Sequence, residues 1–224
     1  MTTPRPLTRV LSALALCAGV LAGSGCVAGA VGADEPPNAT FDLVTPAAVD
    51  APSPARGVQV LVPEPVAVAV LASQRVLVRV SPREVQYLAG ARYTDTLTKL
   101  TQFKLKRALE SSRSIGAAAL PGEGLAIDYQ ILTDIRAFEV RATPAVVAST
   151  DPVAVSARRT AYVSLLVKIL NDRNGNVVAS RVFDSSVPVG PIVGDRTNEA
   201  YLAALDAALD AALVDIRAFV GGRV

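Results

Sequence analysis

Two alternating runs of apolar residues on either side of a turn signal constrain this chain most. Apolar side chains occupy every second position from Val163 to Ile169, and a second apolar run, Val177–Val187, follows Asn174-Gly175. Strict alternation places apolar side chains on one face of a strand, and Asn-Gly between two such runs is a strong hairpin signal. The sequence therefore predicts that Val155–Ile169 and Val177–Val187 form an antiparallel hairpin with one buried face.

A third alternating run, Leu125–Val140, changes phase part-way along. Its apolar residues keep one phase from Leu125 to Ile135, whereas Phe138 and Val140 take the opposite phase. A one-residue slip of this kind is what a β-bulge produces, so we predict a bulge near Ala137. Shorter β-branched runs predict further strands at Val58–Val62, Val66–Leu71, Arg75–Val80 and Val85–Leu88.

Two segments have helical rather than strand periodicity. From Asn198 to Val220 apolar residues recur at three- and four-residue steps until Gly221-Gly222, and Thr94–Ser111 has a similar pattern with Asp95 in its first turn. No linker interrupts residues 58–220. The fold class predicted is therefore α/β (α+β), a single domain with a mostly antiparallel sheet packed by two main helices.

Four basic residues crowd the predicted helix Thr94–Ser111. Lys99, Lys104, Lys106 and Arg107 are interpreted as solvated charges near the carboxyl end of the helix dipole. Contact with an anionic lipid or with a partner is the alternative interpretation.

The body of the chain offers little for catalysis. It contains no histidine, and the two cysteines, Cys17 and Cys26, lie near the amino terminus. The Gly-x-Gly of Pro121–Gly124 precedes a strand rather than joining a strand to a helix, so it reads as a turn and not as a phosphate-binding loop. Four carboxylates could form pairs, but we interpret them as parts of ordinary solvated faces; they are Asp128, Asp134, Asp206 and Asp210. We therefore predict no enzyme activity, and no catalytic, cofactor-binding or metal-binding residues.

The net charge also limits the possible partners. Without Arg5 and Arg9 of the leader, the 22 Lys and Arg residues fall to 20, which matches the 20 Asp and Glu residues. A neutral body lacks the clustered positive charge that nucleic-acid binding requires, so nucleic acid is not expected as a partner.

The amino-terminal segment has the layout of an export signal. Basic residues precede Val10, and no charged residue follows until Asp34. Three fates are consistent with this pattern: an uncleaved membrane anchor, ordinary cleavage after Ala33, or lipoprotein-type cleavage before Cys26. Ser24 and Gly25 fit a lipobox, although Gly23 stands where leucine is preferred. All three place the body outside the cytoplasm.

A tether separates this leader from the body. Residues 34–57 contain five prolines among Ala, Asp and Ser, a composition typical of extended and loosely packed chain. Phe41–Leu43 interrupts this stretch with apolar residues suited to docking on the body.

Several motifs of packing and turn residues follow one another between roughly residues 41 and 220. They are Phe41–Leu43, the Tyr-Leu-x-Gly-Ala-Arg-Tyr motif at Tyr87–Tyr93, the helix Thr94–Ser111, the strand start Asp128–Leu132, the Asn174-Gly175 hairpin and the terminal helix Asn198–Val220. Together these segments resemble the auxiliary lipoprotein component of ABC-type transporters of the Mce, lipid-trafficking kind.

The resemblance implies a division into a lipoprotein signal peptide (1–25), a flexible tether (26–57) and an auxiliary domain (58–224). It implies that Cys26 carries the lipid anchor and that the protein faces the periplasm on the outer membrane of a Gram-negative bacterium. The alternative is a soluble periplasmic protein cleaved at Ala33. Expected partners are the membrane, an Mce-domain protein and the ABC permease and ATPase, with a homo-oligomer possible and no cofactor.

Two functions are consistent with this resemblance. In the first the protein is a non-enzymatic docking subunit with a packed core. In the second it is a carrier with a lipid-binding cavity of several hundred cubic ångströms. The sequence favours docking, because all of its apolar stripes are explained by strand and helix faces that turn toward the core, and no further apolar stripe remains to line a cavity.

Overall fold

The computed structural model describes residues 38–43, 57–142, 159–192 and 194–224. All of the described residues belong to one unit, Asn38–Val224. The predicted signal peptide, Cys26, most of the tether and the first four residues of the predicted strand Val155–Ile169 lie outside them.

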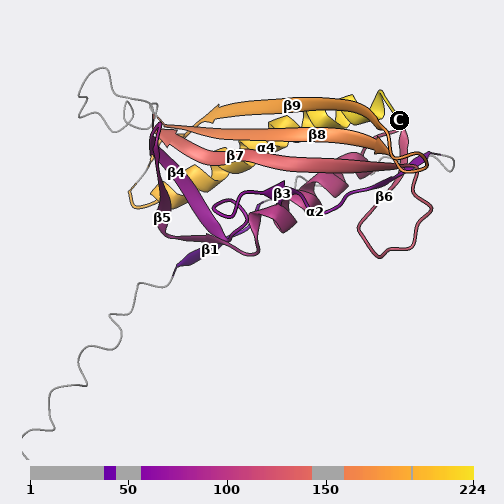
Figure 1. The fold of residues 1–224 in the computed structure, drawn as a ribbon. Coiled ribbons are helices and arrows are strands. Elements are labelled where there is room, and N and C mark those ends of the chain that lie inside the picture. Colours follow the sequence, from indigo (N-terminus) through magenta and orange to yellow (C-terminus); the bar gives the residue numbers. More distant parts are fainter. Residues whose placement is uncertain (1–37, 44–56, 143–158, 193) are drawn as a thin grey trace, which may run out of the picture. The chain divides into compact units, whose positions relative to one another are not determined.

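Three long antiparallel strands form one side of the sheet, which has nine strands in the described residues (Figure 1). They are β7 (Tyr129–Ala142), β8 (Arg159–Asn171) and β9 (Val177–Pro188). The predicted hairpin is confirmed as β8–β9, and Gly175 in its loop has a φ of +71°, a conformation that glycine adopts without strain.

The predicted bulge in β7 is also confirmed. The pairing with β8 matches Ile135 to Leu165 and then Ala137 to Ser164, which leaves Arg136 as the extra residue. The apolar phase of the sequence changes at the same point, because one inserted residue turns all later side chains to the opposite face.

Short strands pair with the other edge of β7, and they pair in parallel. The strands β2 (Val58–Leu61), β3 (Val66–Ala67) and β4 (Arg75–Ser81) lie one after another along β7. β4 continues antiparallel into β5 (Glu84–Tyr93). Two strands that the sequence did not predict complete the sheet in parallel, β1 (Ala39–Phe41) on β5 and β6 (Ile115–Ala119) on β2. The sheet is therefore mixed, with antiparallel pairing in its longest ladders.

Of two predictions for the N-terminal part of the body, one needs adjustment and one is confirmed. The strand predicted at Val66–Leu71 ends at Ala67, because the chain turns there and the amides of Leu71 and Ala72 both bond to the carbonyl of Val68. The docking expected of Phe41–Leu43 is confirmed, since Leu43 is buried and Phe41 packs against the core.

Both predicted helices are present, as α2 (Leu97–Glu110) and α4 (Thr197–Gly221). Helix α4 lies behind β7–β9 in Figure 1 and packs on them, with Phe219 edge-on to Phe183 at 5.3 Å between ring centroids. Helix α2 packs beside α4 and against β6. Among the described residues no helix covers the opposite face of the sheet, which we call the open sheet face.

Candidate functional site

One of the predicted solvated charges is buried between the helices. Lys104 of α2 is 3% exposed and forms ion pairs with Asp206 and Asp210 of α4, at 2.7 Å for Asp210. The interpretation of Lys104 as a solvated charge was therefore wrong, and Asp206 and Asp210 pair with it instead of forming only a solvated face. The two carboxylates approach from the other helix, so the local pattern of α2 could not reveal them.

The other basic residues of α2 lie at its surface as predicted. Lys99 pairs with Asp95 at 3.8 Å and Lys106 pairs with Glu110 at 2.5 Å, one helical turn away in each case. Arg107 is exposed. These contacts are ordinary surface ion pairs of small energetic weight.

The remaining candidate positions have structural roles. Asp128 accepts hydrogen bonds from the Gln59 amide and the Arg173 guanidinium at 3.1 and 2.8 Å, and these bonds lower the pKa of its carboxyl group. Gly122 and Gly124 lie in a turn with φ of +93° and +71°. No cluster of three or more potential metal ligands occurs in the described part of the chain.

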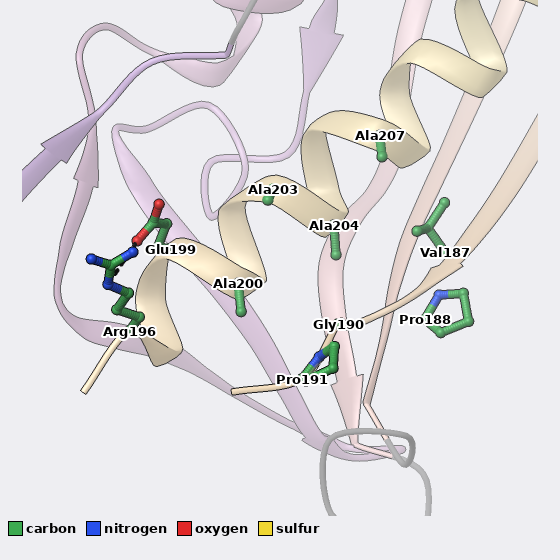
Figure 2. Close-up of a pocket in the computed structure, with 10 residues that line it drawn as sticks. All are labelled: Val187, Pro188, Gly190, Pro191, Arg196, Glu199, Ala200, Ala203, Ala204 and Ala207. Atoms are coloured by element: carbon green, nitrogen blue, oxygen red, sulfur yellow. Dashed lines mark ion pairs between the residues drawn. The ribbon is translucent and has the colours of Figure 1, made fainter. Parts of the chain in front are cut away.

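A groove opens at the surface between α4 and the end of β9 (Figure 2). Its volume is about 410 Å³. We call it the α4–β9 groove and define it by its lining residues: Val187, Pro188, Gly190, Pro191, Arg196, Glu199, Ala200, Ala203, Ala204 and Ala207.

The α4–β9 groove offers few polar groups. Pro188 and Pro191 have no amide proton, and the amide of the intervening Val189 donates to the Arg159 carbonyl. The helical wall presents alanine methyl groups, and its charged pair, Arg196 and Glu199, lies near the start of α4 at 3.9 Å. The groove therefore suits an apolar occupant.

A buried carboxylate lies on the open sheet face. Glu139 is 1% exposed, and the Arg79 guanidinium donates to both of its oxygens at 2.6 and 2.9 Å while Arg141 Nε donates at 2.9 Å. Burial alone would raise the pKa of Glu139, but the two arginines outweigh it and lower the pKa. Glu139 is therefore held as a carboxylate.

Aromatic side chains hold the arginines around this carboxylate. The Arg141 guanidinium lies 3.4 Å from the centroid of the Tyr162 ring, and the Tyr162 hydroxyl donates to Asp184 at 2.7 Å. That hydrogen bond raises the pKa of Tyr162. Arg75 stacks on Tyr87 at 4.7 Å. This cluster was not predicted from the sequence. Its members come from five strands, and the only local signal for them is that they alternate with the core-facing residues of those strands.

The predicted lipid anchor, Cys26, lies outside the described residues. Within the described ranges, no helix combines the length and the apolar character needed to span a bilayer.

The comparisons identify related proteins over most of the chain. A family model of the ABC-type transport auxiliary lipoprotein component matches residues 41–217. A curated relative, an uncharacterized protein of Bradyrhizobium diazoefficiens, is 29% identical over 201 residues, which are 88% of this chain and 47% of the relative. The chain thus spans about half the length of the curated relative that it matches.

Two crystal structures share the fold. A DUF330 protein of Xanthomonas campestris has a TM-score of 0.66 and 25% identity, with 82% of this chain and 96% of that chain covered. An uncharacterized protein has a TM-score of 0.54 at 12% identity, with 82% and 99% covered, and this likeness concerns the fold alone.

Proposed function

Because the chain belongs to the ABC-type transport auxiliary lipoprotein component family, we propose that it is a non-enzymatic docking subunit of a transporter. The transporter would be an Mce-type system that moves lipid or another hydrophobic molecule across the bacterial envelope. Cys26 would carry the lipid anchor and hold the body on the periplasmic side of the outer membrane. The partners would be an Mce-domain protein and the ABC permease and ATPase.

The α4–β9 groove is the observation that carries the docking proposal. The interior between sheet and helices is filled by side chains such as Leu205, Leu209 and Ile216, each at 0% exposed. The apolar groove instead opens at the surface, and its lining is pre-formed by a helix and a strand end. A surface hollow of this kind suits apolar side chains of a partner protein.

The same groove supports a second function, a periplasmic lipid carrier, soluble or anchored. Its volume of about 410 Å³ lies within the range of roughly 300–1,000 Å³ that small-molecule sites occupy. An acyl chain needs no hydrogen-bond donors, and the groove offers few.

Filling the groove tests both functions in one experiment. Ala203 lies on the helical wall of the groove and is exposed, so tryptophan in its place would occupy the groove with little effect on the core. Ala211, on the same helix, is exposed but does not line the groove, so A211W is the matched control. Each full-length variant would be co-expressed with the Mce-domain protein, the permease and the ATPase that are proposed as its partners. The measurements are co-purification with the Mce-domain protein and the mass of extracted lipid.

A docking subunit would lose co-purification in A203W and keep it in A211W. A carrier would instead lose bound lipid in A203W while its association with the transporter is unchanged. If A203W alters neither property, the groove serves neither function and the proposal is wrong.

A further inference from the structure

Positive charge exceeds negative charge on the open sheet face. Arg79 alone neutralises Glu139, because its guanidinium contacts both carboxylate oxygens. Arg141 is therefore a second cation on a carboxylate that already has one. The face carries Arg75, Arg79, Arg136, Arg141 and Lys168 against Asp134, Glu139 and Asp184.

The Arg141 guanidinium is held in place with part of its hydrogen-bonding capacity unused. It donates to Glu139 through Nε, and its Cζ lies 3.4 Å from the centroid of the Tyr162 ring. Its two terminal nitrogens have no acceptor among the described residues, and the side chain is 42% exposed. A fixed guanidinium with free terminal nitrogens is pre-organised to bind an oxyanion through two parallel hydrogen bonds.

The surroundings of Arg141 resemble a protein interface. Arg75 stacks on the half-exposed Tyr87, also without a carboxylate partner in the described ranges. Val85 is 37% exposed, and it lies directly opposite Arg79 in the β4–β5 register. Arginine and tyrosine beside exposed apolar groups are the residues that dominate binding energy at protein interfaces.

We propose that the open sheet face binds a carboxylate-bearing segment of a partner protein, with Arg141 and Arg75 receiving its acidic side chains. Charge complementarity defines this occupant. Binding to an anionic membrane relies on clusters of many basic side chains whose charge acts without a fixed hydrogen-bond geometry. These two arginines are instead held by tyrosine rings, so their planar guanidinium groups have a fixed orientation. The site lies on the side of the sheet away from α4, so it is separate from the α4–β9 groove and goes beyond the proposed function.

A peptide titration tests the site without the transporter. The full chain in neutral detergent micelles would be titrated into a fluorescent peptide of alternating Glu and Val, and binding followed by anisotropy. A peptide of alternating Lys and Val is the probe control. The variants are R141Q, R141K and R75Q, with R173Q as the control, since it removes an equal charge from an arginine whose side chain is 79% exposed in the β8–β9 loop.

We expect saturable binding of the Glu peptide that weakens about tenfold in R141Q and in R75Q and less than about twofold in R173Q. R141K should also lose affinity, because lysine keeps the charge without the planar fork. Circular dichroism of each variant checks that the fold is retained, and Glu139 keeps its Arg79 partner in R141Q.

Three results would overturn the proposal. The first is absence of saturable Glu-peptide binding by the wild-type chain. The second is equal loss in R141Q and R173Q, which would mean that only net charge matters. The third is that a competitor binds as tightly as the Glu peptide and displaces it. Displacement by millimolar inorganic phosphate would identify a phosphate group as the occupant, and displacement by micelles that contain phosphatidylglycerol would identify an anionic lipid.

Discussion

The buried ion pairs of Lys104 allow the sharpest test of how the two helices are held together. The K104M variant keeps most of the aliphatic volume of the side chain and removes its charge. It leaves Asp206 and Asp210, whose side chains are 16% and 32% exposed, without their cation. Two neighbouring carboxylates in a partly buried site then repel each other and lose their compensation.

The expected loss of stability follows from this burial. Removing one partner of a fully buried ion pair costs about 3–5 kcal/mol. Because water still reaches Asp210, we expect the lower end of this range, about 3 kcal/mol in the free energy of unfolding. For a domain of this size such a loss lowers Tm by about 6–12 °C.

Urea unfolding followed by circular dichroism measures this change. The matched control is K99M on the same helix, where the lysine is 49% exposed and lies 3.8 Å from Asp95, and it should change stability by less than about 1 kcal/mol. Adding D206N and D210N to K104M should restore most of the loss, because no uncompensated charge then remains. The reasoning fails if K104M is as stable as wild type, or if the triple variant is no more stable than K104M.

Three further predictions concern other parts of the chain. In a Gram-negative host the intact mass of the wild-type chain should correspond to a protein that begins at Cys26 and carries added acyl groups. The C26S variant should lack these acyl groups. A protein that begins at Asp34 without added mass would exclude the lipid anchor. Because the pKa of Glu139 is lowered from its ordinary 4.5 in the folded state, its stabilising contribution is complete above that value and is lost as the pH falls through the lowered one. E139Q should therefore be less stable than wild type at neutral pH and show a smaller loss of stability in acid, as measured by urea unfolding across pH 2–6. G116A should lower the free energy of unfolding by about 1–3 kcal/mol, because its new methyl group would lie 2.6 Å from the Gly57 carbonyl oxygen. The new methyl group of G122A has open space around it, so this variant measures the cost of a positive φ alone.

Periodic segments of the sequence were predicted well. The alternation of Leu125–Val140 indicated a strand, although β7 begins only at Tyr129. Its change of phase indicated a bulge near Ala137, next to the extra residue Arg136. The hairpin around Asn174-Gly175 and the helix ending near Gly221 were equally clear. Each of these features depends on residues close together in the chain, so the pattern alone could reveal it.

Segments with a weak local pattern were missed. The strand β6 reads Ile-Gly-Ala-Ala-Ala, which has no alternation, and its place in the sheet depends on close approach of Gly116 to Gly57, the residue directly before the neighbouring strand β2. β1 lies in a Pro-rich stretch and is a strand because β5 offers it an edge. In both cases the partner strand supplies the signal.

The sequence by itself determined the strands and helices that have a clear period and which of their faces are apolar, because these properties follow from local periods of two and of 3.6 residues. Tertiary structure alone decided which segments meet. It placed Lys104 beside two carboxylates from a helix about a hundred residues later, and it gathered Arg79, Glu139 and Tyr162 on the open sheet face. A charged residue looks solvated in a local pattern whatever its burial, since its partners are set by the packing of distant elements.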